Sequence, residues 1–221
     1  MAFSTTHEPR ILITAGPTLE PLDPVRGILN RSSGKMGLAL AQASTIRGLP
    51  TSVLLGPVEP AVRQEFLEVA EVEDYASSRD LQGLLTAEWP KHDVLFMASA
   101  VSDLRPVEVA RSKLPRKNLT LQLEPVPDLL ANLARQMPDH GIRIGFALEE
   151  QSRLLARARE KLCAKQCHAI AANPLCTIDS NMVSGVWMTA ESEVPFEQMA
   201  KSAYAEELLN RATRLWSAPS G

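Results

Sequence analysis

The sequence lacks a large excess of charge of either sign. Its 23 basic and 26 acidic side chains leave a formal net charge of −3 over 221 residues. Surfaces that bind nucleic acid or an anionic membrane normally carry a clear positive excess, so neither partner is expected. No apolar run approaches the roughly 20 residues of a membrane span, and the amino-terminal MAFSTTHEPR lacks the hydrophobic segment of a signal peptide. The composition therefore predicts a cytoplasmic protein.

Residues for metal or disulfide chemistry are also few. The cysteines are odd in number and have no CxxC spacing: Cys163, Cys167 and Cys176. This pattern favours reduced thiols in the core over disulfide bonds or metal ligands. The four histidines are scattered, and three of them are expected at the surface or at the ends of elements: His92, His140 and His168. No metal site can be assembled from the sequence, so none is predicted.

Apolar residues make up 45% of the chain, enough for a sizeable core, and form short runs that alternate with helical patterns. The runs predict strands over residues 10–15, 51–56, 93–100, 142–147, 168–173 and 183–190. Helical spacing covers residues 38–47, 80–89, 128–135, 149–165 and 197–216. Residues 17–33 resemble a long loop, and residues 119–125 an arm of a hairpin. This alternation predicts one α/β domain over residues 1–221, with a mostly parallel sheet covered on both faces.

Ligands of such sheets bind beyond the carboxyl ends of the strands. In the predicted sheet these ends are Gly16, Gly56, residues 98–103, Phe146 and Asn173. Functional side chains are therefore expected to gather there.

The segment SSGKMG, residues 32–37, fits neither common phosphate-binding motif. A dinucleotide fingerprint would follow the first strand at once, but more than ten residues intervene, and the second strand ends in Gly56 and Pro57 instead of an acid. A P-loop would need other residues at Leu29 and Met36. The helix start at Ser32, Ser33 and Gly34 can still bind an anion through its free N–H groups and positive dipole end. The alternative is a serine that only caps the helix.

Residues 99–117, SAVSDLRPVEVARSKLPRK, leave a strand end and form a long basic loop. Asp103 follows the strand, and farther along lies a cluster of cations: Lys113, Arg116 and Lys117. These cations repel one another, and Leu114 is the main large apolar residue near them, so we expect a mobile lid that closes on a polyanion. A solvated loop without a ligand is the alternative.

Two further segments carry weaker signals. VPDLL, residues 126–130, predicts a helix start that Asp128 caps. Lys161 and Lys165 lie one turn apart on a predicted helix, which is also typical of a solvated face.

Together these segments resemble those of phosphopantothenate–cysteine ligases. TAGPTLEPLDPVRGILNRSSGKMG, ASAVSDLRPVEVARSK, LEPVPDLL, IGFALEE and AREKLCAKQCHAIAAN occur in the order, and nearly the spacing, of that family, closely over residues 10–173 and loosely beyond. These enzymes are the synthetases of coenzyme A biosynthesis, fused in most bacteria to a flavin-dependent decarboxylase. The matched segments include no decarboxylase, so no flavin is expected and a decarboxylase partner would be a separate protein. The resemblance implies a Rossmann-like three-layer fold with a small β arm, assembled as a homodimer whose substrate sites use residues from both subunits.

The resemblance also implies a reaction. CTP, with ATP as the other candidate, activates the carboxylate of 4′-phosphopantothenate as an acyl-nucleotide, and pyrophosphate leaves. The amine of cysteine then attacks the mixed anhydride and expels CMP. Bringing a carboxylate to a triphosphate requires Mg²⁺, lysines and oriented N–H groups where negative charge accumulates.

Site residues follow by matching positions. Asn30 would contact the phosphopantothenate carboxylate and its activated form, and Arg26 the substrate phosphate. Gly16, with Ser32 and Gly34, would cradle phosphate, and Asn173 would line the site. Lys113 is a second catalytic candidate beside Asn30. The nucleotide would contact Met97, Ala98, Ser99, Asp103, Lys113, Pro127, Asp128, Leu129, Leu130, Phe146, Lys161 and Lys165.

The sequence departs from the family pattern at four places, one of which is an extra residue between Phe146 and Lys161 that makes the match of Lys161 less secure than that of Lys165. Pro17 replaces a glycine of the first loop and deletes an N–H donor. The lysine-rich lid motif becomes KLPRK, residues 113–117, and Pro174 replaces an aspartate. Two other functions remain as alternatives, an NAD(P)-dependent reductase and a non-catalytic nucleotide-binding module. The reductase lacks its ribose-binding acid and has a displaced glycine loop.

Overall fold

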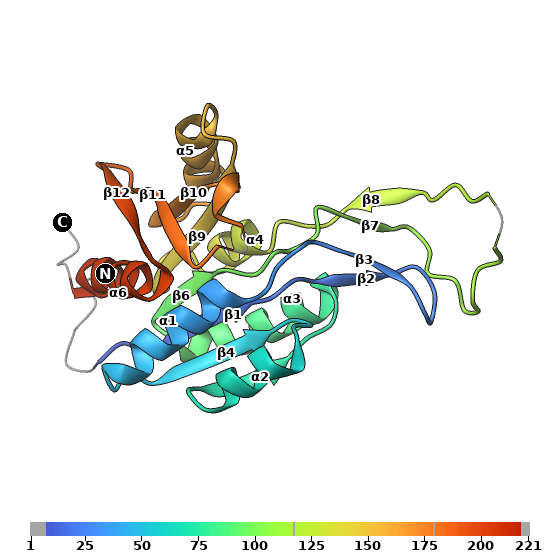
Figure 1. The fold of residues 1–221 in the computed structure, drawn as a ribbon, viewed down its shortest axis with the longest axis horizontal. Helices are drawn as coiled ribbons and strands as arrows, with labels where there is room; N and C mark the ends of the chain where they lie inside the picture. Colours follow the sequence, from blue (N-terminus) through green and yellow to red (C-terminus); the bar gives the residue numbers. More distant parts are fainter. Residues whose placement is uncertain (1–7, 117, 179, 218–221) are drawn as a thin grey trace.

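An eight-stranded sheet forms the centre of the computed structural model, which describes residues 8–116, 118–178 and 180–217 (Figure 1). The strand order is β12-β11-β10-β9-β6-β1-β4-β5. The six strands from β10 to β5 run parallel, and β11 pairs antiparallel with both β10 and β12. The strands are β1 (Ile11–Ala15), β4 (Thr51–Leu55), β5 (Glu71–Asp74), β6 (Val94–Met97), β9 (Ile142–Glu149), β10 (Ala169–Pro174), β11 (Met182–Met188) and β12 (Glu193–Ala200).

Helices cover both faces of this sheet and make a three-layer fold. They are α1 (Lys35–Ile46), α2 (Pro60–Leu67), α3 (Ser78–Glu88), α4 (Leu129–Gln136), α5 (Leu154–Ala164) and α6 (Lys201–Ser217), with the short 3-10 helices η1 (Trp89–Lys91) and η2 (Leu175–Thr177). In β1, Ile11 and Ile13 pack toward α1 and α6, whereas Leu12 packs toward α3 and α4. Successive side chains of a strand point to opposite faces, so continuous apolar runs are needed in strands covered on both sides. The predicted Rossmann-like three-layer class is confirmed.

The predicted elements are largely present, with corrections at some boundaries and at the two edge strands. The charged helix predicted over 149–165 begins only at Leu154, because Glu149 ends β9. The helix predicted over 197–216 begins at Lys201, because residues 193–200 form the edge strand β12. Its Pro195 obscured the strand, since proline is tolerated only on edges. The acidic edge strand β5 was not predicted, because edge strands are short and charged.

Two small ribbons project from the carboxyl edge of the sheet and form the arm (Figure 1). One pairs β2 (Leu19–Pro21) with β3 (Gly27–Leu29), and the other pairs β7 (Leu104–Pro106) with β8 (Leu123–Pro125). The second ribbon confirms the arm predicted from residues 119–125. The first was predicted as a loop, because three-residue strands carry too little pattern to recognise. The ribbons lie side by side because β1 and β6, which lead into them, are neighbours in the sheet.

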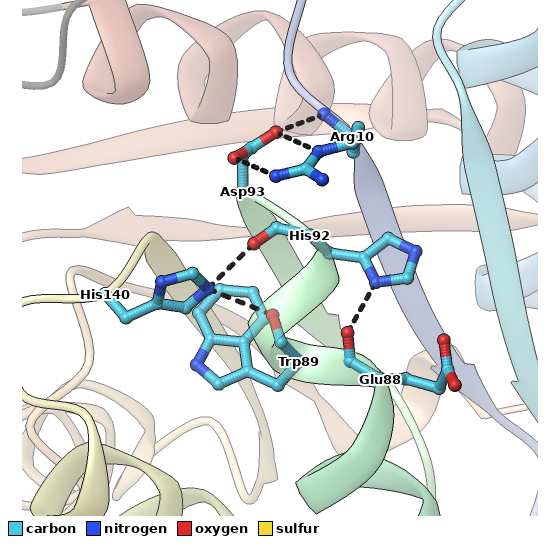
Figure 2. Close-up of polar contacts among 6 residues, drawn as sticks. All are labelled: Arg10, Glu88, Trp89, His92, Asp93 and His140. Carbon is cyan, nitrogen blue, oxygen red and sulfur yellow. Dashed lines mark hydrogen bonds and ion pairs between the residues drawn. The ribbon is translucent and has the colours of Figure 1, made fainter.

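Polar contacts join the segments that precede β1, β6 and β9, at the amino ends of these parallel strands (Figure 2). The Asp93 carboxylate accepts hydrogen bonds from the backbone N–H and the guanidinium of Arg10 at 2.8–3.1 Å. Nε2 of His140 contacts the carbonyl oxygens of Trp89 and His92, and the His92 ring contacts that of Glu88 at 2.7 Å. The histidines do lie at element ends, as predicted, but they join elements instead of facing solvent. This end of the sheet is structural.

The cysteine prediction is partly wrong. Cys163 and Cys176 are exposed, and Cys167 is partly buried. All three are free thiols, but the described core does not use Cys163 or Cys176. Burial raises the pKa of the Cys167 thiol to about 12.

Candidate active site

A cavity of about 710 Å³ opens at the carboxyl edge of the sheet, beside three of the predicted strand ends, residues 98–103, Phe146 and Asn173. The other two predicted ends, Gly16 and Gly56, do not line it. Its volume suits a nucleotide-sized ligand. Most predicted site residues line it: Asn30, Ser32, Gly34, Met97, Ala98, Ser99, Asp103, Pro127, Asp128, Leu129, Leu130, Phe146, Lys161, Lys165 and Asn173. The prediction that these segments converge is therefore confirmed.

The first turn of α1 forms one wall of the cavity. Gly34 is the N-cap and adopts a left-handed conformation with φ 74°, which favours glycine. No side chain among the described residues caps this helix, and Ser32 only accepts a 3.4 Å hydrogen bond from the Gly34 N–H. The alternative of a capping serine is therefore wrong. The free N–H groups of the turn are open to an anion.

Asn30 directly follows β3, where the chain returns from the arm toward α1, and it lines this cavity. Its Nδ2 donates to the carbonyl oxygen of Val101 at 3.0 Å, which joins the strand that precedes α1 to the segment after β6. One N–H of the amide is thereby committed. The other N–H and Oδ1 remain for a ligand.

Two lysines stand on the opposite side, each beside a carboxylate. Lys161 of α5 lies 2.9 Å from Glu149, and Lys165 lies 2.9 Å from Asp128. Burial raises the pKa of Asp128, but the Ala131 N–H and the Lys165 ammonium outweigh it, so the pKa lies below its ordinary value. Asp128 also caps α4, as the sequence predicted. A polyanion entering the cavity would compete with both carboxylates for the lysines.

Comparison with known proteins identifies the family of the chain. Residues 6–215 match the model of the DNA/pantothenate metabolism flavoprotein C-terminal domain. The chain belongs to this family. It is 34% identical over 211 residues to the coenzyme A biosynthesis bifunctional protein CoaBC of Vibrio cholerae, a match that covers 91% of this chain and 51% of that protein. This member of the flavoprotein C-terminal domain family thus spans about half the length of the curated relatives it matches.

Solved structures show the same fold. The crystal structure of the C-terminal domain of a CoaBC protein is 30% identical, with a TM-score of 0.76 that covers 94% of this chain and 95% of that one. A variant of Cab2 in complex with phosphopantothenate-cysteine is 18% identical, with a TM-score of 0.75 that covers 94% and 87% of the two chains, and shows the fold alone.

Three predicted residues of this family member do not line the cavity. Gly16, with φ 78°, packs behind the start of α1, and its carbonyl oxygen accepts from the Ala100 N–H at 2.9 Å. Arg26 and Lys113 lie on the arm, on the turn after β2 and on the connection between β7 and β8. The sequence predicted that these three residues contact the ligand directly. In this structure they lie outside the cavity of their own chain.

The expected lid is also more tightly held than predicted. The Ala110 N–H donates to the Leu22 carbonyl oxygen at 2.9 Å, and Leu114 bonds to Asp23 and Arg26. Arg116 is exposed, and Lys117 lies outside the described residues. Whether the segment moves on binding nucleotide stays a prediction.

Sequence reasoning missed several residues of the site in this family member. Lining residues that were not predicted include Arg31, Lys35, Thr177, Ile178 and Lys201. Lys35 lies within the SSGKMG segment and could have been inferred as part of the helix start. Lys201 could not, because residues 197–200 of β12, the strand that leads to it, were predicted as helix.

Asn173 occupies the end of β10 and is nearly buried. Its Nδ2 donates to the Ser184 carbonyl oxygen at 2.9 Å and to the Tyr204 hydroxyl at 3.1 Å. Burial is the main cause that raises the pKa of Tyr204 to about 12, so this phenol stays protonated. Asn173 therefore has a structural role at the wall as well as a place in the cavity.

The described residues contain no cluster of three or more histidine, cysteine, aspartate or glutamate side chains that could hold a metal ion. Asp103 and Asp128 do line the cavity. Mg²⁺ in nucleotide sites is commonly held by one or two carboxylates together with phosphates. This donor set fits a metal that arrives with a nucleotide.

No helix in the described part of the chain has both the length and the apolar character to cross a bilayer.

Proposed function

We propose that this chain is a phosphopantothenate–cysteine ligase, which joins 4′-phosphopantothenate and L-cysteine in coenzyme A biosynthesis, with CTP yielding CMP and pyrophosphate. One observation carries the proposal: a single cavity unites the open start of α1, Asn30, and the Lys161 and Lys165 pair. Family membership supports it. Relatives named as bifunctional coenzyme A biosynthesis proteins support the pathway.

The charge distribution suits the first half-reaction. A carboxylate must approach a triphosphate, so negative charge accumulates, and preorganised N–H groups and cations stabilise it. The uncapped first turn of α1 supplies the N–H groups, and Lys161 and Lys165 supply the cations. Mg²⁺, held by Asp103 or Asp128 with the phosphates, would neutralise further charge.

The second half-reaction suits Asn30. Its free N–H and Oδ1 can orient the activated acyl group while the Val101 carbonyl oxygen fixes the amide plane. The amine of cysteine then forms the amide bond, and the nucleoside monophosphate leaves with the electrons of the broken acyl–phosphate bond.

We infer a homodimer in which the arm of one copy reaches the cavity of the other. Arg26 and Lys113 lie on the arm and do not line the cavity of their own chain. The arm also exposes apolar side chains, with exposed fractions of 40–66%, that a second copy would cover: Val25, Leu29, Leu104, Val107, Val109, Leu119, Leu121 and Leu123. Such a dimer gives Lys113 access to the triphosphate and Arg26 access to the substrate phosphate.

The alternatives fit less well. A dinucleotide-dependent reductase would place its glycine-rich turn directly after β1, but the β2–β3 ribbon intervenes before α1. A non-catalytic nucleotide-binding module would have no use for Asn30 beside the phosphate-binding helix start.

Pyrophosphate release tests the proposal. The purified chain with Mg²⁺, CTP and 4′-phosphopantothenate should release pyrophosphate, and cysteine should convert the activated acid to an amide with release of CMP. Nucleotide binding without pyrophosphate release would favour the binding module, and hydride transfer from a nicotinamide would favour the reductase.

A further inference from the structure

The turn between β2 and β3 grips the segment that carries Lys113. The Asp23 carboxylate accepts from the Leu114 N–H at 3.0 Å, and Nη2 of Arg26 donates to the Leu114 carbonyl oxygen at 2.8 Å. Both backbone groups of one residue are thus bound by side chains some 90 positions away in the sequence. We call Asp23, Arg26 and the Leu114 backbone the latch.

Asp23 is the centre of the latch. Its Oδ1 accepts from the N–H groups of Val25 and Arg26 at 2.8 and 2.9 Å, and its Oδ2 accepts from Nε and Nη2 of Arg26 at 3.0 and 2.6 Å. None of its side-chain surface is exposed, although the arm projects from the body. A buried carboxylate with this many donors is held in one orientation.

The latch stays charged at neutral pH. The Leu114 N–H, followed by the Arg26 guanidinium and the N–H groups of Val25 and Arg26, holds the pKa of Asp23 well below its usual range, against the opposing effect of burial. The groups facing this carboxylate are all donors or cations. Acid would protonate Asp23 and open the latch only at a pH below the usual pKa range of a carboxyl group.

Lys113 is restrained from both sides as a result. Leu114 is bound on its carboxyl side, followed by Pro115 with its fixed φ. On the amino side, the Ala110 N–H is bound to the Leu22 carbonyl oxygen. The three residues between these anchors have little freedom, although their side chains are exposed.

We propose that Asp23 is a positioning residue that acts through Arg26 and Leu114 to hold Lys113 in the place from which it meets the triphosphate. This rests on the proposed function in so far as Lys113 acts on a nucleotide. Arg26 keeps 43% of its side chain exposed, so it can serve the latch and still contact an anion.

Hydrogen exchange of the unmodified protein is the first test. The Leu114 amide should exchange more slowly than the amides of Ser112 and Lys113, for which none of the described residues provides an acceptor. Equal exchange of the three amides would overturn the latch. This measurement needs no activity and no variant.

Asp23→Asn is the second test, with Asp74→Asn as the matched control, because Asp74 forms an exposed ion pair with Arg63 away from the cavity. Asp23→Asn should speed trypsin cleavage after Lys113 and Arg116 and slow pyrophosphate release, by up to roughly a hundredfold, since small misplacements of a positioned group cost that much. The control should change neither. Wild-type cleavage and turnover in Asp23→Asn would overturn the proposal.

A double variant separates positioning from general damage. If Asp23 acts through Lys113, Asp23→Asn in a Lys113→Gln background should slow pyrophosphate release no further than Lys113→Gln alone. An additive loss would show that Asp23 acts elsewhere. If Asp23→Asn fails to fold, Arg26→Lys replaces it as the test. This variant keeps the charge of Arg26 but loses the forked geometry of the guanidinium, so it should speed trypsin cleavage after Lys113 and Arg116. If the wild-type chain releases no pyrophosphate at all, the proposed function fails, while exchange and cleavage still decide the latch.

Discussion

Asn30 donates a hydrogen bond from Nδ2 to the carbonyl oxygen of Val101 across 3.0 Å, and this contact joins the two connections that leave β1 and β6. The side chain of Asn30 is therefore oriented before any ligand enters. A carboxylate in its place would face the Val101 carbonyl oxygen without a proton to share. The pair therefore makes the amide of Asn30 a sensitive position for substitution.

Asn30→Asp should uncouple the two half-reactions. The new charge would repel the substrate carboxylate and release the side chain from Val101, so capture of the activated acid by cysteine should slow by about a hundredfold or more. Pyrophosphate release should persist at a reduced rate. Single-turnover measurements of pyrophosphate and amide would show this, and amide formation at the wild-type rate would refute the role of Asn30.

Lys113 should act in trans. Lys113→Gln is expected to slow pyrophosphate release about a hundredfold, because one charge at the triphosphate is lost, with little change in melting temperature. Mixing it with a cavity variant, Lys165→Gln, should restore activity to about one quarter of the sites if chains exchange freely in a two-fold dimer.

The arithmetic of mixing makes this prediction sharp. Only mixed dimers contain a cavity with an intact Lys165 next to an arm with an intact Lys113. If each arm serves the cavity of its own chain, every site of the mixture carries one defect and no activity returns. A matched mixture of two cavity variants, Lys165→Gln and Lys161→Gln, should also remain inactive.

CTP should be preferred over ATP. The expectation comes from the resemblance to the bacterial ligases, with its NRSSGKMG segment and the Lys161 and Lys165 pair. Comparison of kcat/KM for the two nucleotides at saturating phosphopantothenate would test it, with a preference on the order of tenfold or more expected. Equal or greater use of ATP would change the nucleotide and leave the reaction class intact.

His168 should make the fold sensitive to acid. Burial, and then the Arg143 guanidinium, lower the pKa of His168 to about 4, and its Nδ1 accepts from the Arg143 N–H at 3.1 Å. Between that value and the ordinary pKa near 6.5, the unfolded chain binds a proton that the native chain does not, so stability falls as the pH falls. The loss reaches about 3 kcal/mol for a shift of this size.

His168→Asn offers the corresponding measurement. The asparagine keeps an acceptor for the Arg143 N–H but does not titrate in this range. Denaturant unfolding at several pH values between 7 and 4 should show a shallower loss of unfolding free energy in the variant. Parallel curves for the two proteins would contradict the assignment.

The sequence alone predicted most of the sheet and much of the cavity. Short, largely apolar runs such as 10–15 and 142–147 favour strands covered on both faces, and their alternation with helices favours a parallel sheet. Parallel strands bring their carboxyl ends to one edge, so residues 97–103, Phe146 and Asn173 meet there. Local pattern was sufficient because each of these residues lies next to an element whose direction is determined by its neighbours.

Tertiary structure decided what lies beyond those ends. The edge strands β5 and β12 and the three-residue strands of the arm have too few apolar residues for a recognisable period, and their hydrogen bonds come from distant partners. The placement of Lys113 and Arg26 outside the cavity and the grip of Asp23 on Leu114 depend on one fact of topology. β1 and β6 are neighbours in the sheet, so the connections that leave them run side by side, and no local pattern encodes a contact between residues some 90 positions apart.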